Sequence, residues 1–398
     1  QSKREQLSPE VALELAIYLN GQPKRINKGK DKAAWQLHPW IFSGAIARVS
    51  ESLQNGDIVS VYNHDDEFIA YGMYNKQSRV AVRLLEWDPQ KEISEGWWRD
   101  RLQRAVKNRT HLLNDKNNTV RLVFAEADFL PGLIADKYGD YISVQVHAAG
   151  MERVKAIVVD ELQQLLNPKG VYERSDLKSR EHEGLADTNG LLAGEMPPPF
   201  VDIIENGIHY QVNIVEGQKS GFYCDQRDNR YITSKYVKDK RVLDCFCYSG
   251  GFTLNAFREG AASVTSVDSS ALAIETLQKN IQLNGFDSSK HIAVQSDVNK
   301  YLRELGEQRE KFDLIILDPP KYAPSRSTLE KASRAYKDLN RRGLMLLNSG
   351  GLLATFSCSG AMDIDTYKQV LAWAALDAGK EIQFIYQYFN DGMLNGSA

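Results

Sequence analysis

The sequence predicts an α/β protein whose C-terminal half is a doubly wound, mainly parallel sheet, preceded by a small β-barrel domain and a central α+β domain. From residue 241 onward, apolar runs such as "RVLDCFC", "SVTSVD" and "FDLIILDPP" alternate with segments of helical periodicity. Between residues 21 and 87, short alternating strands are instead separated by Gly, Asn and Asp, as in small barrels. The length of 398 residues fits two or three domains.

The composition is that of an ordinary globular protein. Hydrophobic residues make up 42% and charged residues 25% of the chain, and the formal net charge of -3 says nothing about partners. Four cysteines do not make a disulfide framework, and the apolar runs are too short for a membrane span or a signal peptide. We therefore predict a cytoplasmic protein without a membrane partner.

The predicted elements group into four segments. Residues 1–22 carry apolar positions at helical spacing behind a Ser-Pro pair, which predicts a lead helix. Residues 23–93 hold the alternating strands, and residues 94–198 combine helical segments with strands and glycine turns, which predicts an α+β domain. The three prolines of "EMPPPF" disfavour both helix and sheet and mark its end. Residues 199–398 then form the doubly wound domain.

Ligands of open α/β sheets bind outside the carboxyl ends of the strands, so the residues that follow each strand are candidate site residues. After "RVLD" comes the loop "CFCYSGGF", in which Gly250 and Gly251 allow a tight turn and close approach of the backbone to a ligand. Tyr248 lies in the same loop. Asp268 ends the next strand, at a separation from Asp244 that suits a carboxylate binding ribose hydroxyls. These residues predict a nucleoside site.

The pattern favours S-adenosylmethionine (SAM) over a nicotinamide dinucleotide. The fingerprint GxGxxG is missing, and the carboxylate of Asp244 would repel a pyrophosphate but attract a cationic methyl donor. Asp297, after the third strand, stands where an adenine edge is expected. Gln226 and Arg227, in a polar segment before the first strand, are candidates for a lid over the donor. The alternative is that each aspartate caps the helix that follows it.

A stiff polar segment follows the fourth strand. In "DPPKY" both prolines fix φ, and the residue before a proline is pushed into extended geometry, so Asp318 is held as part of a wall that suits a flat base. Here the chain resembles the class I methyltransferases, in which an Asp-Pro-Pro segment lines the target base beside the methyl donor. The resemblance makes Asp318 a catalytic and donor-site candidate, and Pro319, Pro320 and Lys321 candidates for contact with the substrate.

Cys358 closes the fifth predicted strand, next to the Asp-Pro-Pro strand, so its sulfur is expected to face the same cleft. The alternative is a small buried hydrophobe, which most free cysteines are. Because C5 of a pyrimidine becomes nucleophilic only after a thiolate adds to C6, we predict that Cys358 is a catalytic nucleophile. Lys321 is a candidate cation for stabilising the thiolate. Cys245 and Cys247 lack a second pair of ligands, so we predict packing and no metal site.

Nearly the whole chain resembles the ribosomal large-subunit cytosine-5 methyltransferases that carry an N-terminal PUA domain. The matching segments are "HPWIFSGAI", "GDIVSVYN", "YGMYN", "FLPGLIADKYGD", "VYERSD", "GQKSGFYCDQR", "VLDCFCYSGGFTLNAF", "DPPKY" and "FSCSG". The resemblance implies a Rossmann-like methyltransferase domain, a PUA barrel that grips RNA, SAM as the donor, and 23S-type rRNA or an assembly particle as the partner. It leaves open homodimer formation and the base that removes the C5 proton.

The resemblance also implies a closing hairpin beyond "IQFIYQYF" that completes a seven-stranded sheet, whereas the given sequence continues only into "NDGMLNGSA". Whether the closing strands are shortened or lie outside the given sequence stays open.

A basic run beside the first strands is the candidate RNA grip. It consists of Lys24, Arg25, Lys28, Lys30 and Lys32, with Trp35, His38 and Trp40 nearby. Cations bind phosphates and aromatic rings stack on bases, although charge runs more usually form solvated loops. Two other functions stay open. One is methylation of a base nitrogen, which needs no cysteine, and the other is a non-catalytic role in RNA binding or ribosome assembly.

Overall fold

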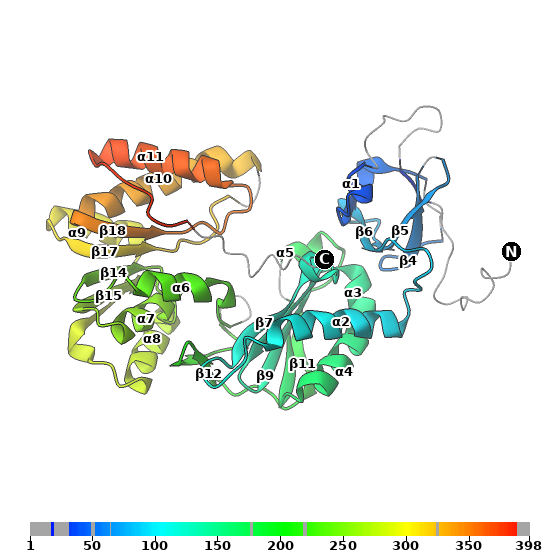
Figure 1. The fold of residues 1–398 in the computed structure, drawn as a ribbon, viewed down its shortest axis with the longest axis horizontal. Helices are drawn as coiled ribbons and strands as arrows, with labels where there is room; N and C mark the ends of the chain where they lie inside the picture. Colours follow the sequence, from blue (N-terminus) through cyan, green and yellow to red (C-terminus); the bar gives the residue numbers. More distant parts are fainter. Residues whose placement is uncertain are drawn as a thin grey trace. The chain divides into compact units, whose positions relative to one another are not determined.

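The chain forms two compact units in the computed structural model (Figure 1). The first unit comprises Gln1–Val201 and Asn213–Phe222, and the second comprises Asp202–Val212 and Tyr223–Ala398. The structure describes residues 17–19, 32–48, 52–63, 65–175, 178–217, 221–323 and 326–387.

The first unit begins with a mainly antiparallel six-stranded sheet in the order β2-β6-β5-β4-β1-β3. Its strands are β1 (Ile17–Leu19), β2 (Trp40–Phe42), β3 (Ile46–Arg48), β4 (Ile58–Tyr62), β5 (Phe68–Tyr74) and β6 (Val80–Glu86). Helix α1 (Lys32–Trp35) precedes β2. Alternation places Val59 and Val61 of β4 inside, where they pack with Ile69, Val82 and Leu84.

The predicted lead helix is wrong for the part of it that the structure describes. Ile17–Leu19 form β1, which pairs in parallel with β4 and antiparallel with β3. A β-branched residue followed by a tyrosine favours a strand, and pairing with two neighbours outweighs the helical spacing of the surrounding residues. Residues 1–16 and 20–22 of the predicted helix lie outside the described residues.

The first unit continues with an α+β part, a five-stranded sheet in the order β11-β10-β9-β8-β7 with helices packed against it. Its elements are α2 (Glu95–Thr110), β7 (Thr119–Phe124), β8 (Leu133–Tyr138), β9 (Tyr141–Val146), α3 (Ala149–Arg153), α4 (Lys155–Leu166), β10 (Gly170–Ser175), α5 (Lys178–Glu181) and β11 (Thr188–Gly194). One apolar core joins Met73 and Leu85 of the barrel strands to Trp98 and Leu102 of α2, so the two parts pack as one unit.

A two-stranded hairpin opens the second unit. It consists of β12 (Val201–Glu205) and β13 (Ile208–Val212), joined at Asn206 and Gly207. Both turn residues have positive φ angles, +53° and +77°, as the Asn-Gly turns of two-residue hairpins require.

The remainder of the second unit is an all-parallel sheet in the order β16-β15-β14-β17-β18. Its strands are β14 (Arg241–Cys245), β15 (Ser263–Asp268), β16 (His291–Gln295), β17 (Phe312–Leu317) and β18 (Leu347–Thr355). The helices are α6 (Arg227–Ser234), α7 (Gly251–Arg258), α8 (Ala271–Leu283), α9 (Val298–Glu307), α10 (Leu329–Leu346) and α11 (Ile364–Ala378). This confirms the predicted doubly wound domain.

Helices cover both faces of this sheet (Figure 1). Val242 of β14 points to the face covered by α7, and the next residue, Leu243, points to the face covered by α9, α10 and α11. Because both faces are buried, the strands read as nearly continuous apolar runs in the sequence. From β14 the chain continues to β15, its neighbour on one side, and then to β16 at that edge of the sheet. It later returns to β17, the neighbour of β14 on the other side. The strand order therefore reverses between β14 and β17, which is the switch point of the sheet.

In the described part of the chain the parallel sheet has five strands, and residues 381–387 belong to no strand. None of the helices among the described residues combines the length and the apolar character that crossing a bilayer would need.

Candidate active site

The loop after β14 is held in an unusual backbone conformation. Phe246, Tyr248 and Gly250 have φ angles of +63°, +48° and +91°, and non-glycine residues rarely adopt such angles. A Cβ atom on Gly250 would overlap the side chain of Leu277. Strain of this kind persists only where surrounding structure fixes it, and it concentrates at functional sites. The predicted tight turn is therefore present, and Gly250 is needed for it.

Asp244 lies at the switch point and is fully buried. Its Oδ2 accepts a hydrogen bond from the hydroxyl group of Thr253 at 2.7 Å. The Thr253 oxygen is 2.7 Å from Oγ of Ser266, which is 2.9 Å from Nε2 of His291. Because the Thr253 proton goes to the carboxylate, Ser266 donates to Thr253 and His291 donates to Ser266. A chain of hydrogen bonds thus fixes one oxygen of the carboxylate.

The other oxygen, Oδ1 of Asp244, is buried without a hydrogen-bond partner among the described residues. Burial raises the pKa of Asp244 to about 7, against the lowering effect of Thr253 and with a further increase from the charge of Asp318. An unpaired buried carboxylate oxygen is costly unless a cation or a donor group approaches it. Asp244 is therefore suited to bind a positively charged group.

Asp268, at the end of β15, lies almost completely buried beside this loop. Its two carboxylate oxygens accept hydrogen bonds from the backbone N–H groups of Tyr248 at 3.0 Å and Ser270 at 2.9 Å. The ring of Tyr248 meets the ring of Tyr223 edge to face, with centroids 5.5 Å apart. Asp268 thus organises the loop after β14, and each of its oxygens keeps a second lone pair for a ligand.

Asp297 differs from Asp244 and Asp268 in its exposure to solvent and in its structural role. It is exposed, and its Oδ1 accepts a hydrogen bond of 2.8 Å from the backbone N–H of Lys300, so it is the N-cap of α9. This is the alternative role that the sequence left open for aspartates at strand ends.

Asp318 directly follows β17, as expected. Its Oδ1 accepts a hydrogen bond of 3.0 Å from the side-chain amide of Gln226, which is almost fully buried and in turn accepts from Asn229 at 2.6 Å. Gln226 therefore reaches the predicted site. Arg227 instead pairs with the neighbouring Asp228 at 3.3 Å.

The sequence predicts that Cys358 closes a buried strand, and this prediction is wrong. Strand β18 ends at Thr355, the last ladder bond runs from the N–H of Phe356 to the carbonyl of Leu317, and Cys358 lies beyond it in an exposed loop. Its thiol is 3.8 Å from the carbonyl oxygen of Pro319, to which it donates. The cysteine thus lies against the Asp-Pro-Pro segment, and the hydroxyl groups of Ser357 and Ser359 bond to the Tyr336 side chain.

The other cysteines differ from Cys358. All four cysteines are free, and burial raises the pKa values of Cys245 and Cys247 well above the ordinary value. Both thiols are therefore unreactive packing groups at neutral pH. Of the stiff segment, Pro319 is buried, whereas Pro320 and Lys321 are exposed.

Sequence reasoning missed several side chains that shape the site. Burial, together with the charges of Tyr248 and Asp318, raises the pKa of Tyr223, and the charge of Cys358 adds to the effect. The Tyr223 hydroxyl therefore stays protonated at neutral pH. In the sequence, Tyr223 is only one residue of the polar stretch "GFYCDQR". The spacing of residues does not predict the direction of its ring, so the sequence did not mark it as a site residue. Arg230, three residues beyond this stretch, belongs to the polar segment that the sequence singles out, and it is buried in an ion pair with Glu205 at 2.7 Å.

Four of the five cations in the predicted RNA grip, Lys24, Arg25, Lys28 and Lys30, lie outside the described residues. Lys32 begins α1 and is exposed. Three aromatic residues nearby in the sequence are exposed: Trp35, Trp40 and Phe42 are 46%, 38% and 51% exposed. The rings of Trp40 and Phe42 meet edge to face at 6.4 Å.

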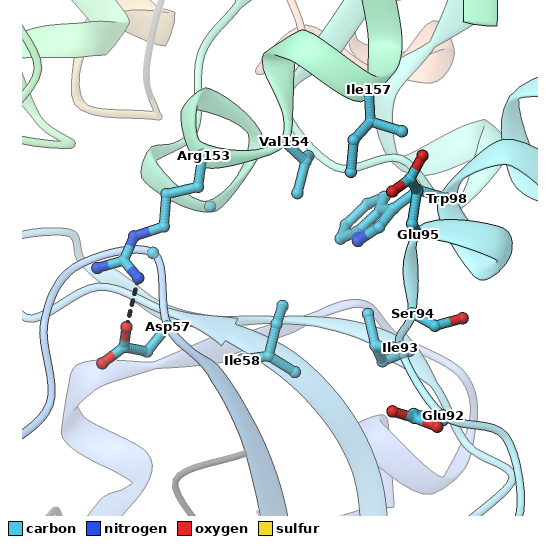
Figure 2. A pocket seen from close by; sticks show the side chains of 12 residues that line it. Asp57, Ile58, Glu92, Ile93, Ser94, Glu95, Trp98, Arg153, Val154 and Ile157 are labelled. Atoms are coloured by element: carbon cyan, nitrogen blue, oxygen red, sulfur yellow. Dashed lines mark hydrogen bonds and ion pairs between the residues drawn. The ribbon is translucent and has the colours of Figure 1, made fainter. Parts of the chain in front are cut away.

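A separate cleft lies within the first unit and has a cavity volume of about 490 Å³ (Figure 2). Ile58, Ile93 and Trp98 line it with apolar surface, and an ion pair between Arg153 and Asp57, at 2.6 Å, bounds one side. None of the predicted site residues lines this cleft.

Comparison with known proteins agrees with the two-part organisation. A model for a PUA-like domain matches residues 25–87, and a model for an S-adenosylmethionine-dependent methyltransferase matches residues 180–379. Among solved structures, a protein assigned to the methyltransferases and solved with S-adenosylhomocysteine has a TM-score of 0.77 at 22% identity, covering 91% of this chain and 90% of that one. A protein from Streptococcus mutans, assigned as a SAM-dependent methyltransferase, has a TM-score of 0.76 at 22% identity. The match covers 92% of this chain and 90% of that one. These structures share the fold.

Curated relatives are closer in sequence. Ribosomal RNA large subunit methyltransferase I of Klebsiella pneumoniae is 41% identical over 362 residues, which cover 91% of this chain and 90% of the relative. The protein of the same name from Escherichia coli O157:H7 is also 41% identical over 362 residues and 91% of both chains. With the matched domains, these relatives show that the chain belongs to the ribosomal RNA large subunit methyltransferase I family of SAM-dependent methyltransferases.

Proposed function

We propose that this SAM-dependent methyltransferase forms 5-methylcytosine in large-subunit ribosomal RNA through a covalent bond between Cys358 and C6 of the base. The observation that carries the proposal is the contact between the Cys358 thiol and the Pro319 carbonyl, at 3.8 Å. This contact puts a thiol beside the segment Asp318-Pro319-Pro320, which is stiff enough to hold a flat base in one orientation.

The residues at the switch point fit SAM. Asp244 offers a buried oxygen without a partner, which suits the cationic amino-acid end of the donor. In this proposal Asp268 binds the ribose hydroxyls, and the carboxylate oxygen of Asp297 that does not cap α9 meets an adenine edge. The main chain at Tyr248, Gly250 and Gly251 forms the turn against which such a ligand would lie. SAM, when bound, supplies a methyl group on a positively charged sulfur.

Cys358 has two tasks in this reaction. Its thiolate adds to C6 of cytosine, so the C5–C6 double bond supplies the electron pair that makes C5 nucleophilic. After C5 has gained the methyl group and lost its proton to a base, the electrons of that C–H bond restore the double bond and expel the thiolate. Asp318 and the exposed Lys321 flank the two prolines of the segment that Cys358 contacts, and we propose that they orient the base and stabilise the thiolate.

We propose ribosomal RNA as the substrate because the relatives are named for it and because the first unit carries a PUA-like domain. The exposed rings of Trp35, Trp40 and Phe42 offer faces on which unpaired bases could stack. Lys32 and the basic residues that precede it in the sequence supply cations for phosphates. Four free cysteines fit the reducing cytoplasm.

A trapping experiment tests the proposal. Large-subunit rRNA containing 5-fluorocytosine is incubated with the protein and SAM, and covalent complexes are separated on a denaturing gel. Fluorine cannot leave C5 as a proton does, so the cysteine adduct persists after methyl transfer. We expect a shifted band with the wild type and with Cys224→Ala, a control that removes another cysteine, and no band with Cys358→Ala.

The contrary result is equally informative. If the wild type methylates the RNA and calorimetry confirms SAM binding, but no adduct forms and Cys358→Ala stays active, the enzyme methylates a base nitrogen. If SAM does not bind at all, the non-catalytic role is favoured.

A further inference from the structure

The two serines that flank Cys358 bond to the same buried phenol group. Oγ of Ser357 donates to the hydroxyl group of Tyr336 at 3.0 Å, and the same hydroxyl is 2.9 Å from Oγ of Ser359. The backbone N–H of Ser359 donates to Oγ of Ser357 at 3.3 Å, which closes a ring of hydrogen bonds. The residues on both sides of Cys358 are therefore held by the hydroxyl group of Tyr336.

The direction of each hydrogen bond follows from the donors available. Oγ of Ser359 accepts from the backbone N–H of Ala323 at 3.0 Å. The single proton of the Tyr336 hydroxyl is free to go to Ser359, because that hydroxyl already accepts from Ser357. Ser357 thus donates to Tyr336, and Tyr336 donates to Ser359. Ser359 also accepts a hydrogen bond from the backbone of Ala323, in the segment that follows Asp-Pro-Pro.

Tyr336 is a rigid support. It lies on α10 with no exposed surface, and its ring packs between those of Tyr322 and Tyr367 at centroid distances of 4.9 and 5.3 Å. Burial raises its pKa, against the lowering effect of Ser357 and Ser359, so the hydroxyl keeps its proton and can donate at neutral pH.

We propose that Tyr336 is a positioning residue, which acts through Ser357 and Ser359 to hold the thiol of Cys358 against the Asp-Pro-Pro segment. The proposal rests on the function assigned to Cys358 above. Support of this kind is needed because Cys358 itself is exposed and lies past the end of β18, where no strand ladder holds it. Through Ala323, the same hydroxyl network joins the loop of the nucleophile to the loop of the base wall.

The chain offers a matched control in Tyr367. Its hydroxyl is also buried, bonds to Thr355 at 2.7 Å and to the carbonyl of Phe356 at 3.2 Å, and lies in the same apolar cluster as Tyr336. Each Tyr→Phe change removes one buried hydroxyl from this cluster. Only Tyr336→Phe removes the group that bonds to the serines beside Cys358.

The experiment measures three quantities for the wild type, Tyr336→Phe and Tyr367→Phe. These are the single-turnover rate of adduct formation on 5-fluorocytosine rRNA at saturating SAM, the Kd for SAM, and the KM for unmodified RNA. A displacement of about 1 Å can slow a reaction about a hundredfold. We expect Tyr336→Phe to lower the adduct rate about tenfold to a hundredfold with both affinities unchanged, and Tyr367→Phe to lower it less than about threefold.

A second pair of variants keeps the test valid if Tyr336→Phe does not fold. Ser359→Ala and Ser357→Ala each remove one hydrogen bond to the phenol. If both serines act through Tyr336, the double variant Ser357→Ala/Ser359→Ala should lose much less rate than the product of the two single losses. Equal losses in Tyr336→Phe and Tyr367→Phe, or a wild-type rate in Tyr336→Phe, overturn the positioning role. Absence of any adduct in the wild type instead overturns the cytosine-5 function itself.

Discussion

The hydroxyl group of Thr253 donates a hydrogen bond of 2.7 Å to Oδ2 of Asp244, and neither side chain has exposed surface. This bond satisfies one oxygen of a buried carboxylate and leaves the other without a partner in the described structure. The free protein therefore carries an incompletely compensated carboxylate at the centre of its parallel sheet. Such a group costs stability, and a bound cation would recover that cost.

Asp244→Asn should stabilise the protein at high pH and abolish SAM binding. The pKa of Asp244 in the folded protein, about 7, lies above its ordinary value of 3.8, so ionisation of this carboxyl increasingly destabilises the fold as pH rises between those values. The amide removes that cost. We expect a gain of about 4 kcal/mol in the free energy of unfolding at pH 8 and little gain at pH 4, measured by urea denaturation without SAM. Equal gains at both pH values would contradict the raised pKa.

The affinity for SAM should depend on pH through the same group. Below pH 7 the carboxyl of Asp244 becomes protonated and no longer attracts a cation, so the Kd should rise by up to about tenfold per pH unit as the pH falls. Above pH 7 the Kd should level off. Calorimetric titrations between pH 5.5 and 8.5 measure this, with Thr253→Val as a second variant. The hydrogen bond from Thr253 lowers the pKa of Asp244, so its loss in Thr253→Val should raise that pKa and move the transition to higher pH. A Kd independent of pH would exclude Asp244 from the donor site.

Breaking the buried ion pair of Arg230 and Glu205 should strongly destabilise the second unit. The side chains are joined by two bonds of 2.7 Å and are 3% and 1% exposed. Arg230→Met leaves a buried carboxylate without its partner and should lower the free energy of unfolding by about 3–5 kcal/mol. The double variant Arg230→Met/Glu205→Leu should recover part of that loss. Denaturant unfolding of the three proteins measures both effects, and a double variant no better than the single one would argue against this account.

Gly250→Ala should damage the protein far more than Gly285→Ala. Both glycines have positive φ angles, +91° and +66°, but a Cβ atom at Gly285 meets nothing within 4 Å, whereas one at Gly250 overlaps Leu277. We expect a loss of about 1 kcal/mol for Gly285→Ala from backbone strain alone. For Gly250→Ala we expect about 3 kcal/mol, because overpacking adds to the strain. Thermal unfolding measures both, and similar losses would show that the clash at Leu277 relaxes easily.

Phe42→Ala should weaken RNA binding. Loss of one stacking face is worth about 1–3 kcal/mol, which corresponds to a five- to hundredfold higher Kd for single-stranded rRNA fragments. Leu191→Ala, on β11 of the same unit, is a suitable control because Leu191 is 43% exposed. Filter binding at two salt concentrations measures both. An effect of equal size in the two variants would exclude a specific base contact at Phe42.

Much of the fold could be predicted because its signals are local. The parallel sheet follows from apolar runs that alternate with helical periodicity. Asp244, Asp268 and Asp318 could be selected as candidate site residues for the same reason, since each stands at a strand end. The extended conformation of Ile17–Leu19 escaped prediction because it depends on partners in β3 and β4 rather than on neighbouring residues.

The details of the site depend on contacts between residues far apart in the sequence. Asp297 has the same position relative to its strand as the other aspartates, yet the structure gives it the N-cap of α9. The place of Cys358 in a loop follows from where β18 loses its partner, and the support from Tyr336 comes from another helix. Periodicity says nothing about such side-chain hydrogen bonds, so only the structure reveals them.

The hairpin β12–β13 has a consequence for how the polypeptide can be divided. The chain enters the second unit at Asp202, returns to the first for Asn213–Phe222, and then enters the second again. The returning segment is tied to the first unit, where Arg174 donates to the carbonyls of Ile214 and Gly217. No single cleavage therefore releases either unit intact. Limited proteolysis near residue 200 should leave two fragments that stay associated until denatured, and circular permutation there should be poorly tolerated.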